Sequence, residues 1–314
     1  MNIFNLFETN ELEVFKPDSL AFVYSEQYNI PLQEHIFPGN KFRKIYELLC
    51  LDKQYSELSF FEPNKALRQQ LSLVHTKEYL EDLFQYRNTD KTKYSELPLN
   101  PKILDCFLYA VGGTILATEL SSQFKTVFNI GGGFHHSFSD HAEGFCYLND
   151  IAIAAEMYRL KNPDHKILIL DLDVHQGNGN AKIFENHENI FTFSIHSDCI
   201  YPKKEISDLD INIPDNIKDD KYLQILNKSL ADILLNFKPD LVYYLAGADI
   251  YENDSLGNFK ISMKGIKQRD SIVKKFISDC NSKLVVLTAG GYAKSFMDTI
   301  FIHLQTAQVF GSSK

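Results

Sequence analysis

The chain has 314 residues, a net charge of −9 and 44% hydrophobic residues. This composition is typical of a globular protein with a large core, and the negative balance argues against nucleic acid as a direct partner. No apolar run predicts a membrane span, and the N-terminus lacks the pattern of a signal peptide. Five cysteines without paired spacing favour reduced thiols and a cytoplasmic location.

Five short runs rich in β-branched and aromatic residues predict strands that are buried on both faces. In chain order they are Phe124–Ile130, Lys166–Leu172, Ile190–Ile195, Asp240–Ala246 and Lys283–Ala289. The predicted helices are Lys102–Leu120, Leu148–Leu160, Tyr222–Asn236, Met263–Cys280 and Lys294–Gln308. Strands that alternate with helices predict a mostly parallel sheet with helices on both faces. No repeat or linker interrupts the pattern, so we expect one α/β domain over residues 1–314.

Polar or glycine-rich segments follow four of these strands at the point where each strand ends. They are 131–136 with its pair of histidines, 171–179, 247–249 and 290–292. Because the carboxyl ends of parallel strands meet at one edge of a sheet, residues far apart in the sequence are expected to converge there. One such ending is weak evidence for a site, but four together favour a functional site over four unrelated turns.

The segment 171–175 is the most informative of the four. Residues two apart in an extended chain point to the same side, so Asp171, Asp173 and His175 would face one way. An aspartate and a histidine at this spacing can reach one cation, and Asp249 could supply a third ligand. Three protein ligands leave one position open for water or substrate, as catalytic zinc sites require. Two carboxylates and an imidazole would also accept Fe²⁺ or Co²⁺.

With these residues assembled, the sequence resembles the histone deacetylase superfamily, which has an arginase-like α/β fold. The resemblance runs from about Tyr24 to Gln308. Its motifs are GGGFHH (131–136), GFCYLND (144–150), DLDVHQGNG (171–179), GADIYENDSLG (247–257) and AGGY (289–292). The chain is most similar to class IV enzymes, because Phe134 precedes the histidine pair, Asn178 follows HQG, and YSEQYNI stands near the start.

The resemblance implies a role for each matching residue. His136 would be the general base and then the general acid, with His135 beside it as an electrostatic partner. Asp171 would orient His135, and Asn178 would lie behind His136. Tyr292 would donate a hydrogen bond to the substrate carbonyl. The zinc ligands would be Asp173, His175 and Asp249. A structural potassium ion would be held by the side chains of Asp171 and Ser194 and by backbone oxygens of Asp171, Asp173, His175 and Ile195.

A narrow apolar channel would have to admit the methylenes of an acylated lysine. Matching positions suggest as its walls Phe134, Gly144, Phe145, Ile200, Tyr201 and Leu256. Ordinary core packing is the alternative for each, and it is equally strong for Leu256 and Ile200.

Two departures from the family pattern matter. Class I enzymes have an aspartate where this chain has Asn178, so His136 is expected to be less basic here. The loop at residues 200–204 also departs from the class IV pattern.

The activity that the resemblance implies is zinc-dependent hydrolysis of acyl-lysine, acetyl or longer, in proteins or peptides. Two alternatives stay open: hydrolysis of a small acylated amine such as an acetylpolyamine, and a catalytically weak acyl-lysine binding module. A ureohydrolase on the same fold would need two manganese ions and a further carboxylate two residues after Asp249. Tyr251 occupies that position, which disfavours a binuclear site.

Overall fold

One parallel sheet of eight strands organises the protein. The computed structural model describes residues 20–32, 35–55 and 59–311. Within them the strand order is β2-β1-β3-β8-β7-β4-β5-β6, and each neighbouring pair is parallel. The strands are β1 (Leu20–Val23), β2 (Phe60–Phe61), β3 (Thr126–Asn129), β4 (Ile167–Asp171), β5 (Ile190–Ser197), β6 (Leu209–Ile213), β7 (Leu241–Leu245) and β8 (Lys283–Leu287).

The five strands predicted from the sequence are β3, β8, β7, β4 and β5, which lie side by side in the sheet. Every residue of β4 and β7 is buried, as expected for strands that are covered on both faces. No local sequence pattern predicts β1, β2 and β6. Late in the sequence, β8 enters the sheet between β3 and β7, so it joins the earlier part of the sheet to the later part.

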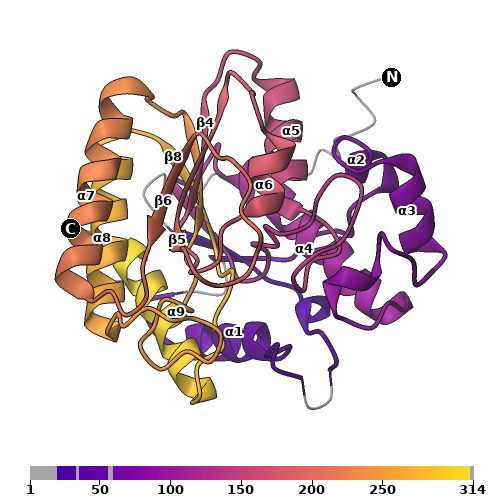
Figure 1. Cartoon of the computed structure of the whole chain (residues 1–314), viewed down its shortest axis with the longest axis horizontal. Coiled ribbons are helices and arrows are strands. Elements are labelled where there is room, and N and C mark those ends of the chain that lie inside the picture. The colour runs from indigo at the N-terminus through magenta and orange to yellow at the C-terminus, as the bar shows by residue number, and fades with distance from the viewer. Residues whose placement is uncertain (1–19, 33–34, 56–58, 312–314) are drawn as a thin grey trace.

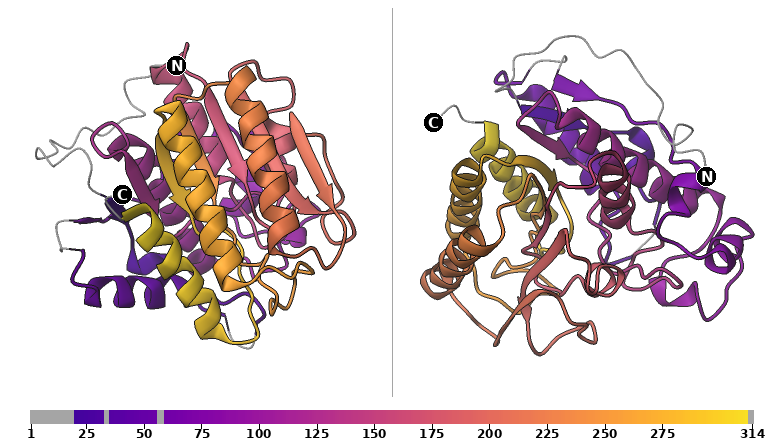
Figure 2. Two further views of the ribbon diagram at one scale, coloured as in Figure 1. Left: turned by 90° about the vertical axis from the view of Figure 1, so that its left-hand side faces the viewer. Right: turned by 90° about the horizontal axis from the view of Figure 1, so that it is seen from above.

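Helices cover both faces of the sheet, which confirms the predicted α/β architecture. The helices α7, α8 and α9 cover one face, and α4 and α5 cover the other (Figures 1 and 2). The helices are α1 (Lys41–Leu51), α2 (Arg68–Leu71), α3 (Lys77–Phe84), α4 (Pro101–Leu120), α5 (Asp150–Lys161), α6 (Asn178–Ile183), α7 (Asp219–Asn236), α8 (Met263–Cys280) and α9 (Phe296–Gly311). Two short 3₁₀ segments are η2 (Glu26–Tyr28) and η4 (Lys93–Ser95).

The helix α4 has the length and apolar composition of a membrane span, but it lies in the core. In its most apolar window, 78% of the residues are buried within the fold. It packs against α5 and β3. Asn100 caps its first turn by accepting a hydrogen bond from the backbone of Ile103, and Pro101 supplies the first helical residue. A buried core helix therefore accounts for this apolar segment.

Candidate metal and catalytic site

A turn, and not an extended strand, carries Asp173 and His175, the first two metal-ligand candidates in the sequence. The strand β4 ends at Asp171, whose Oδ1 accepts a hydrogen bond from the backbone N of Asp173 at 3.1 Å. In the same way, Asp173 Oδ1 accepts from the backbone N of His175 at 3.0 Å. The prediction that strand alternation orients all three was therefore wrong, because the aspartates bend the backbone beyond β4. Leu172 and Val174 are fully buried, as predicted.

Asp173, His175 and Asp249 meet at the carboxyl edge of β4 and β7. One potential ligand atom from each lies within 4.8 Å of the others. His175 Nδ1 lies 3.1 Å from Asp173 Oδ1 and 3.2 Å from Asp249 Oδ2. All three side chains are buried. Two carboxylates and one imidazole that converge in this way fit a zinc-type cation with one coordination position left open.

The turn after β8 holds one of these ligand candidates in place. The backbone N of Gly290 donates a hydrogen bond to Asp173 Oδ2 at 2.8 Å. A Cβ atom at Gly290 would lie 2.1 Å from Asp249 Oδ2 and 2.5 Å from Asp173 Oδ2. Only glycine therefore lets the backbone approach both carboxylates so closely.

The two carboxylates also control the protonation of the imidazole between them. Burial lowers the pKa of His175, but the hydrogen bonds and charges of Asp173 and Asp249 outweigh burial and raise this pKa to about 10. A cation at this position competes directly with the imidazole proton.

The histidine pair stands beside the metal-ligand candidates. His135 Nδ1 lies 2.7 Å from Asp171 Oδ2, and His136 Nδ1 lies 2.7 Å from Asn178 Oδ1. The two Nε2 atoms face each other at 3.1 Å. The structure therefore places Asp171 and Asn178 behind the two imidazoles, on the side away from the space between them.

The two imidazoles have opposite pKa shifts. Burial lowers the pKa of His135, but the charge of Asp171 and of Asp173 outweighs burial and raises it to about 9. For His136, burial and the neighbouring charges of His135 and His175 hold the pKa well below its ordinary value, and the hydrogen bond to Asn178 offsets only part of this. His136 is therefore neutral at pH 7 and can accept a proton.

A buried aspartate fixes the backbone that leads to the histidine pair. Asp150, the first residue of α5, accepts hydrogen bonds from the backbone N of Phe134 at 2.8 Å and of Gly133 at 3.0 Å. Its second oxygen also accepts from the Thr114 hydroxyl at 2.5 Å. Asp150 ends the GFCYLND motif, but the motif alone indicates no role for it.

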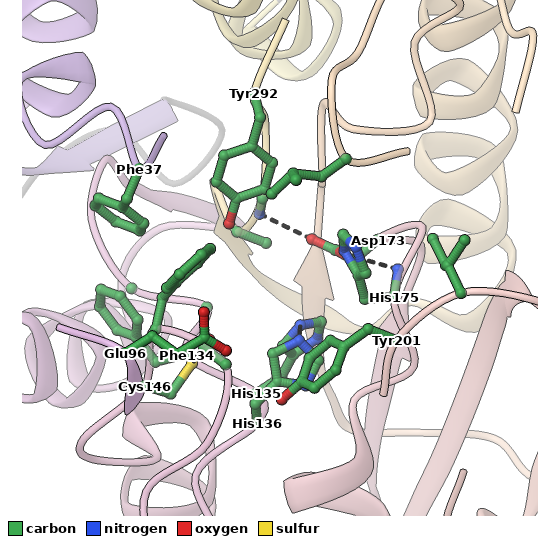
Figure 3. A pocket seen from close by; sticks show the side chains of 18 of the residues that line it. Phe37, Glu96, Phe134, His135, His136, Cys146, Asp173, His175, Tyr201 and Tyr292 are labelled. Atoms are coloured by element: carbon green, nitrogen blue, oxygen red, sulfur yellow. Dashed lines mark hydrogen bonds and ion pairs between the residues drawn. The ribbon is translucent and has the colours of Figure 1, made fainter. Parts of the chain in front are cut away.

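A second aspartate positions the tyrosine of the AGGY motif. Asp254 Oδ2 accepts from the backbone N of Tyr292 at 2.7 Å, and Oδ1 accepts from the backbone N atoms of Leu256 and Gly257, each at 2.9 Å. The Tyr292 hydroxyl is directed into the pocket (Figure 3). Burial, followed by the charges of Asp173 and Asp249, raises the pKa of Tyr292 well above its ordinary value. The hydroxyl therefore keeps its proton and can donate it in a hydrogen bond.

Two metal-ligand candidates, the histidine pair and the tyrosine line one pocket of about 320 Å³, namely Asp173, His175, His135, His136 and Tyr292. Its walls include all six residues suggested for the channel and both histidines of the pair (Figure 3). Three further wall residues lie outside the sequence motifs, namely Phe37, Phe42 and Glu96. At Gly144, which has a φ of +48°, a Cβ atom would lie 2.6 Å from His136 Cδ2 and 2.7 Å from the Tyr201 hydroxyl, so a larger residue would displace both side chains.

A buried lysine that no sequence motif indicates lies behind the AGGY turn. Lys41 is 1% exposed, and its ammonium donates a hydrogen bond to the carbonyl oxygen of Ala289. The ammonium lies 5.8 Å from the ring centroid of Phe37 and 5.3 Å from that of Phe42. Burial lowers the pKa of Lys41 to about 8, even though nearby carboxylates oppose that shift. No local signal distinguishes it from an exposed lysine at the start of a helix.

Three of the residues suggested for a potassium site lie on two paired strands. Asp171 of β4 is in register with Ser194 of β5, and Ile195 follows Ser194. All three are buried. The Ser194 hydroxyl lies 2.8 Å from His196 Nδ1.

Comparison with known proteins identifies the family. Residues 35–307 match the model of the histone deacetylase domain. The chain is 38% identical over 284 residues to an uncharacterized protein of Picosynechococcus, with 90% of this chain and 95% of that protein covered. It is 33% identical over 291 residues to histone deacetylase 2 of Arabidopsis thaliana, with 88% and 75% covered.

Solved structures share the fold. An HDAC homolog crystallised with SAHA superposes with a TM-score of 0.82 at 23% identity, covering 94% of this chain and 85% of that one. An HDAC homolog from Aquifex aeolicus gives a TM-score of 0.81 at 21% identity, with the same coverage. The domain match and the Arabidopsis relative together show that this chain is a member of the histone deacetylase family and a hydrolase of amide bonds.

Proposed function

We propose that this protein is a zinc-dependent lysine deacylase of the class IV type, which hydrolyses the amide bond between an acyl group and a lysine side chain. The observation that carries the proposal is that two potential ligands (Asp173 and His175), a neutral histidine and a tyrosine hydroxyl line one pocket, while the third potential ligand, Asp249, lies within ligand distance of the first two. Asp173, His175 and Asp249 would hold the ion. Bound there, zinc would polarise the substrate carbonyl and make a water molecule more acidic.

The side chains around the ion would move the protons. His136 Nε2 takes a proton from the attacking water, since its pKa keeps the imidazole neutral at pH 7. As the carbonyl oxygen gains negative charge, the Tyr292 hydroxyl donates a hydrogen bond to it. His136 then gives its proton to the departing lysine nitrogen. The products are a free lysine amine and a carboxylate.

We also propose a structural potassium ion beside β4 and β5. Asp171 and Ser194 pair in register there, which supports a shared site for their side-chain oxygens and the backbone oxygen of Ile195. Such an ion would lie behind the turn that carries Asp173 and His175 and would stiffen it.

The test is turnover of a substrate panel by the zinc-loaded protein. Acetyl-, octanoyl- and myristoyl-lysine peptides and an acetylated polyamine are incubated separately, and mass spectrometry measures the freed amine. The control is zinc-loaded His136→Ala, which should lose about 10²–10⁴-fold in rate while it retains metal. Turnover of peptides supports the proposal, and turnover of the polyamine alone replaces it with the small-amine alternative. Peptide binding without any turnover would identify a binding module.

A metal count distinguishes this proposal from a two-manganese ureohydrolase. Among the described residues, Asp173, His175 and Asp249 form the one group with metal-ligand spacing. Tyr251 donates a hydrogen bond to Asp298 at 3.3 Å and lies where a bridging carboxylate would be needed. We therefore expect one tightly bound transition metal per chain by mass spectrometry of the metal, and two would contradict the proposal.

A further inference from the structure

A chain of hydrogen bonds connects His136 to a carboxylate at the rim of the pocket. Asn178, whose Oδ1 lies 2.7 Å from His136 Nδ1, donates from its Nδ2 to Glu143 Oε1 at 3.1 Å. The same carboxylate oxygen accepts a hydrogen bond from the Tyr201 hydroxyl at 2.8 Å. We call His136, Asn178, Glu143 and Tyr201 the Glu143 relay. Neither the sequence motifs nor the family resemblance assigned a role to Glu143.

The relay leaves one orientation for the amide of Asn178. An ionised carboxylate can only accept hydrogen bonds, so Glu143 binds the NH₂ end of the amide. The carbonyl end must then face His136. Because a carbonyl oxygen also can only accept, His136 Nδ1 carries the hydrogen and Nε2 keeps its lone pair. This is the tautomer that a proton acceptor at the floor of the pocket requires.

The surroundings of Glu143 keep its carboxylate ionised. Burial by itself raises its pKa, but the nearby His141 and the hydrogen bonds from Tyr201 and Asn178 outweigh burial and hold the pKa below its ordinary value. A protonated Glu143 could instead donate to the amide oxygen and reverse the orientation of Asn178. The relay therefore stays in one arrangement at neutral pH.

The other end of the relay acts on the wall of the pocket. The Tyr201 ring lies 5.3 Å from the His136 ring and 6.3 Å from the His175 ring, measured between centroids. The residue is 44% exposed, so its hydroxyl bond to Glu143 helps to hold the ring against the histidines.

We propose that Glu143 is a positioning residue for the hydrolysis, because it fixes the Asn178 amide and, through this amide, the tautomer of His136. The inference rests on the proposed function in one respect, namely that His136 is the general base. Glu143 takes no part in proton transfer and touches no reacting atom. Its effect therefore falls mainly on the rate of the chemical step, and the hydrogen bond to Tyr201 adds a smaller effect on substrate affinity.

The first test compares two substitutions of similar size in the zinc-loaded enzyme. Glu143→Met removes the acceptor, and we expect kcat to fall on the order of 10- to 100-fold, part of what proton transfer contributes, with KM changed by less than about threefold. Glu143→Gln keeps an acceptor oxygen for Asn178 and Tyr201 and should retain more than about a third of kcat. Asp90→Asn is the control, since this exposed carboxylate pairs with Lys93 and with neither Asn178 nor Tyr201. Equal losses in the Met and Gln variants would contradict the proposal.

The second test reads the tautomer directly. Nitrogen-15 labelling of the ten histidines and two-bond N–H correlation spectra distinguish an Nδ1–H from an Nε2–H imidazole. The His136 signal is assigned by its loss in His136→Ala. We expect the Nδ1–H pattern in the wild-type protein and a second, Nε2–H population in Glu143→Met. An unchanged pattern in Glu143→Met would overturn the inference, even if its kcat were lower.

The third test exchanges the hydrogen-bond donor and acceptor between positions 178 and 143. Asn178→Asp places a second carboxylate against Glu143, and like charges at this distance repel. Adding Glu143→Gln supplies an NH₂ donor to the new carboxylate. The kcat of the double variant should therefore exceed the kcat of Asn178→Asp by at least about tenfold. A double variant no better than Asn178→Asp would contradict the relay. If the wild-type enzyme turned over no substrate of the panel, the proposed function would fail, while the spectra would still test the tautomer.

Discussion

The guanidinium of Arg269 donates a hydrogen bond to the carbonyl oxygen of Gly247 at 2.6 Å, so a helix beside the sheet holds the turn that presents Asp249. Arg269 lies on α8 and is fully buried. It forms an ion pair of 2.9 Å with Asp270, whose carboxylate also accepts hydrogen bonds from Tyr244 at 2.6 Å and Thr306 at 2.7 Å. This buried cluster connects β7, α8 and α9 directly behind the metal-ligand candidates.

We predict that Arg269→Met destabilises the protein by about 3–5 kcal/mol, because it leaves the buried Asp270 carboxylate without its partner. Zinc affinity should fall as well, since the turn at Gly247 loses its hydrogen bond. The matched control is Lys275→Met on the same helix, which removes an exposed pair with Asp279 and should cost less than about 1 kcal/mol. Urea unfolding of both variants measures the difference, and equal costs would contradict this prediction.

We predict that His175→Ala abolishes both zinc retention and turnover, since one of three protein ligands is lost. Wild-type zinc affinity should rise as the pH rises through neutrality, because the carboxylates raise the pKa of His175 and the bound proton must leave before the ion binds. Titration with a competing chelator between pH 6 and pH 8 measures this dependence. A His175→Ala protein with stoichiometric zinc and near-normal turnover would show that the ligands lie elsewhere.

We predict that Tyr292→Phe lowers kcat by about 10²–10³-fold, the usual effect of removing one donor to a developing oxyanion. The substitution removes one oxygen and little volume, so folding and metal content should not change. Affinity for an acyl-lysine peptide should weaken far less, because the hydroxyl binds the transition state more strongly than the ground-state carbonyl. Peptide affinity and turnover are measured on one zinc-loaded preparation. A parallel fall in both would make Tyr292 a substrate-binding residue.

We predict that His75 makes folding stability depend on pH. Burial lowers its pKa to about 4, despite its hydrogen bond to the Phe138 carbonyl, and His75 Nε2 accepts from the backbone N of Asn149 at 3.1 Å. The unfolded chain, with an ordinary pKa near 6.5, therefore binds the proton first as pH falls, so this contribution to stability is present above pH ~6.5 and declines toward pH ~4.

The measurement is urea unfolding of wild-type protein and His75→Gln with a chelator present, so that metal loss does not contribute. Between pH 7 and pH 5 the stability advantage of wild type over His75→Gln should shrink by about 2 kcal/mol. An advantage that stays constant over this range would mean that His75 titrates normally in the folded protein.

The sequence predicted those parts of the fold that carry a strong local signal. The strand β4 reads as ILILD and β7 as LVYYL, and both were predicted because a strand buried on two faces must be almost wholly apolar. The strand β1 has only four residues and β2 only two, too few to form a pattern. In β6 the apolar residues do alternate with polar ones, but the strand is only partly buried and contributes a weak signal.

The residues of the candidate site also divide into those that the sequence could predict and those that it could not. Asp173, His175 and Asp249 could be proposed from residue type and from their position after strands, since topology brings those ends together. Glu143 and Lys41 could not, because their importance depends on partners 35 and 248 residues away. The turn that redirects the backbone after Asp171 was missed because side-chain hydrogen bonds to the backbone ended the strand, which alternation of residues does not reveal.

The strand β8 lies in the middle of the sheet but comes last among the strands in the sequence. A newly made chain can therefore assemble the candidate metal site only after β8 has been synthesised. A growing chain that stops before residue 283 contains every metal-ligand candidate, yet the strand that joins β3 to β7 is missing. It also lacks the backbone N of Gly290 that fixes Asp173, 117 positions earlier. Synthesis from the N-terminus therefore delivers the ligands long before the element that orders them. We therefore expect the proposed metal site to become ordered only after the chain has been synthesised past Gly290.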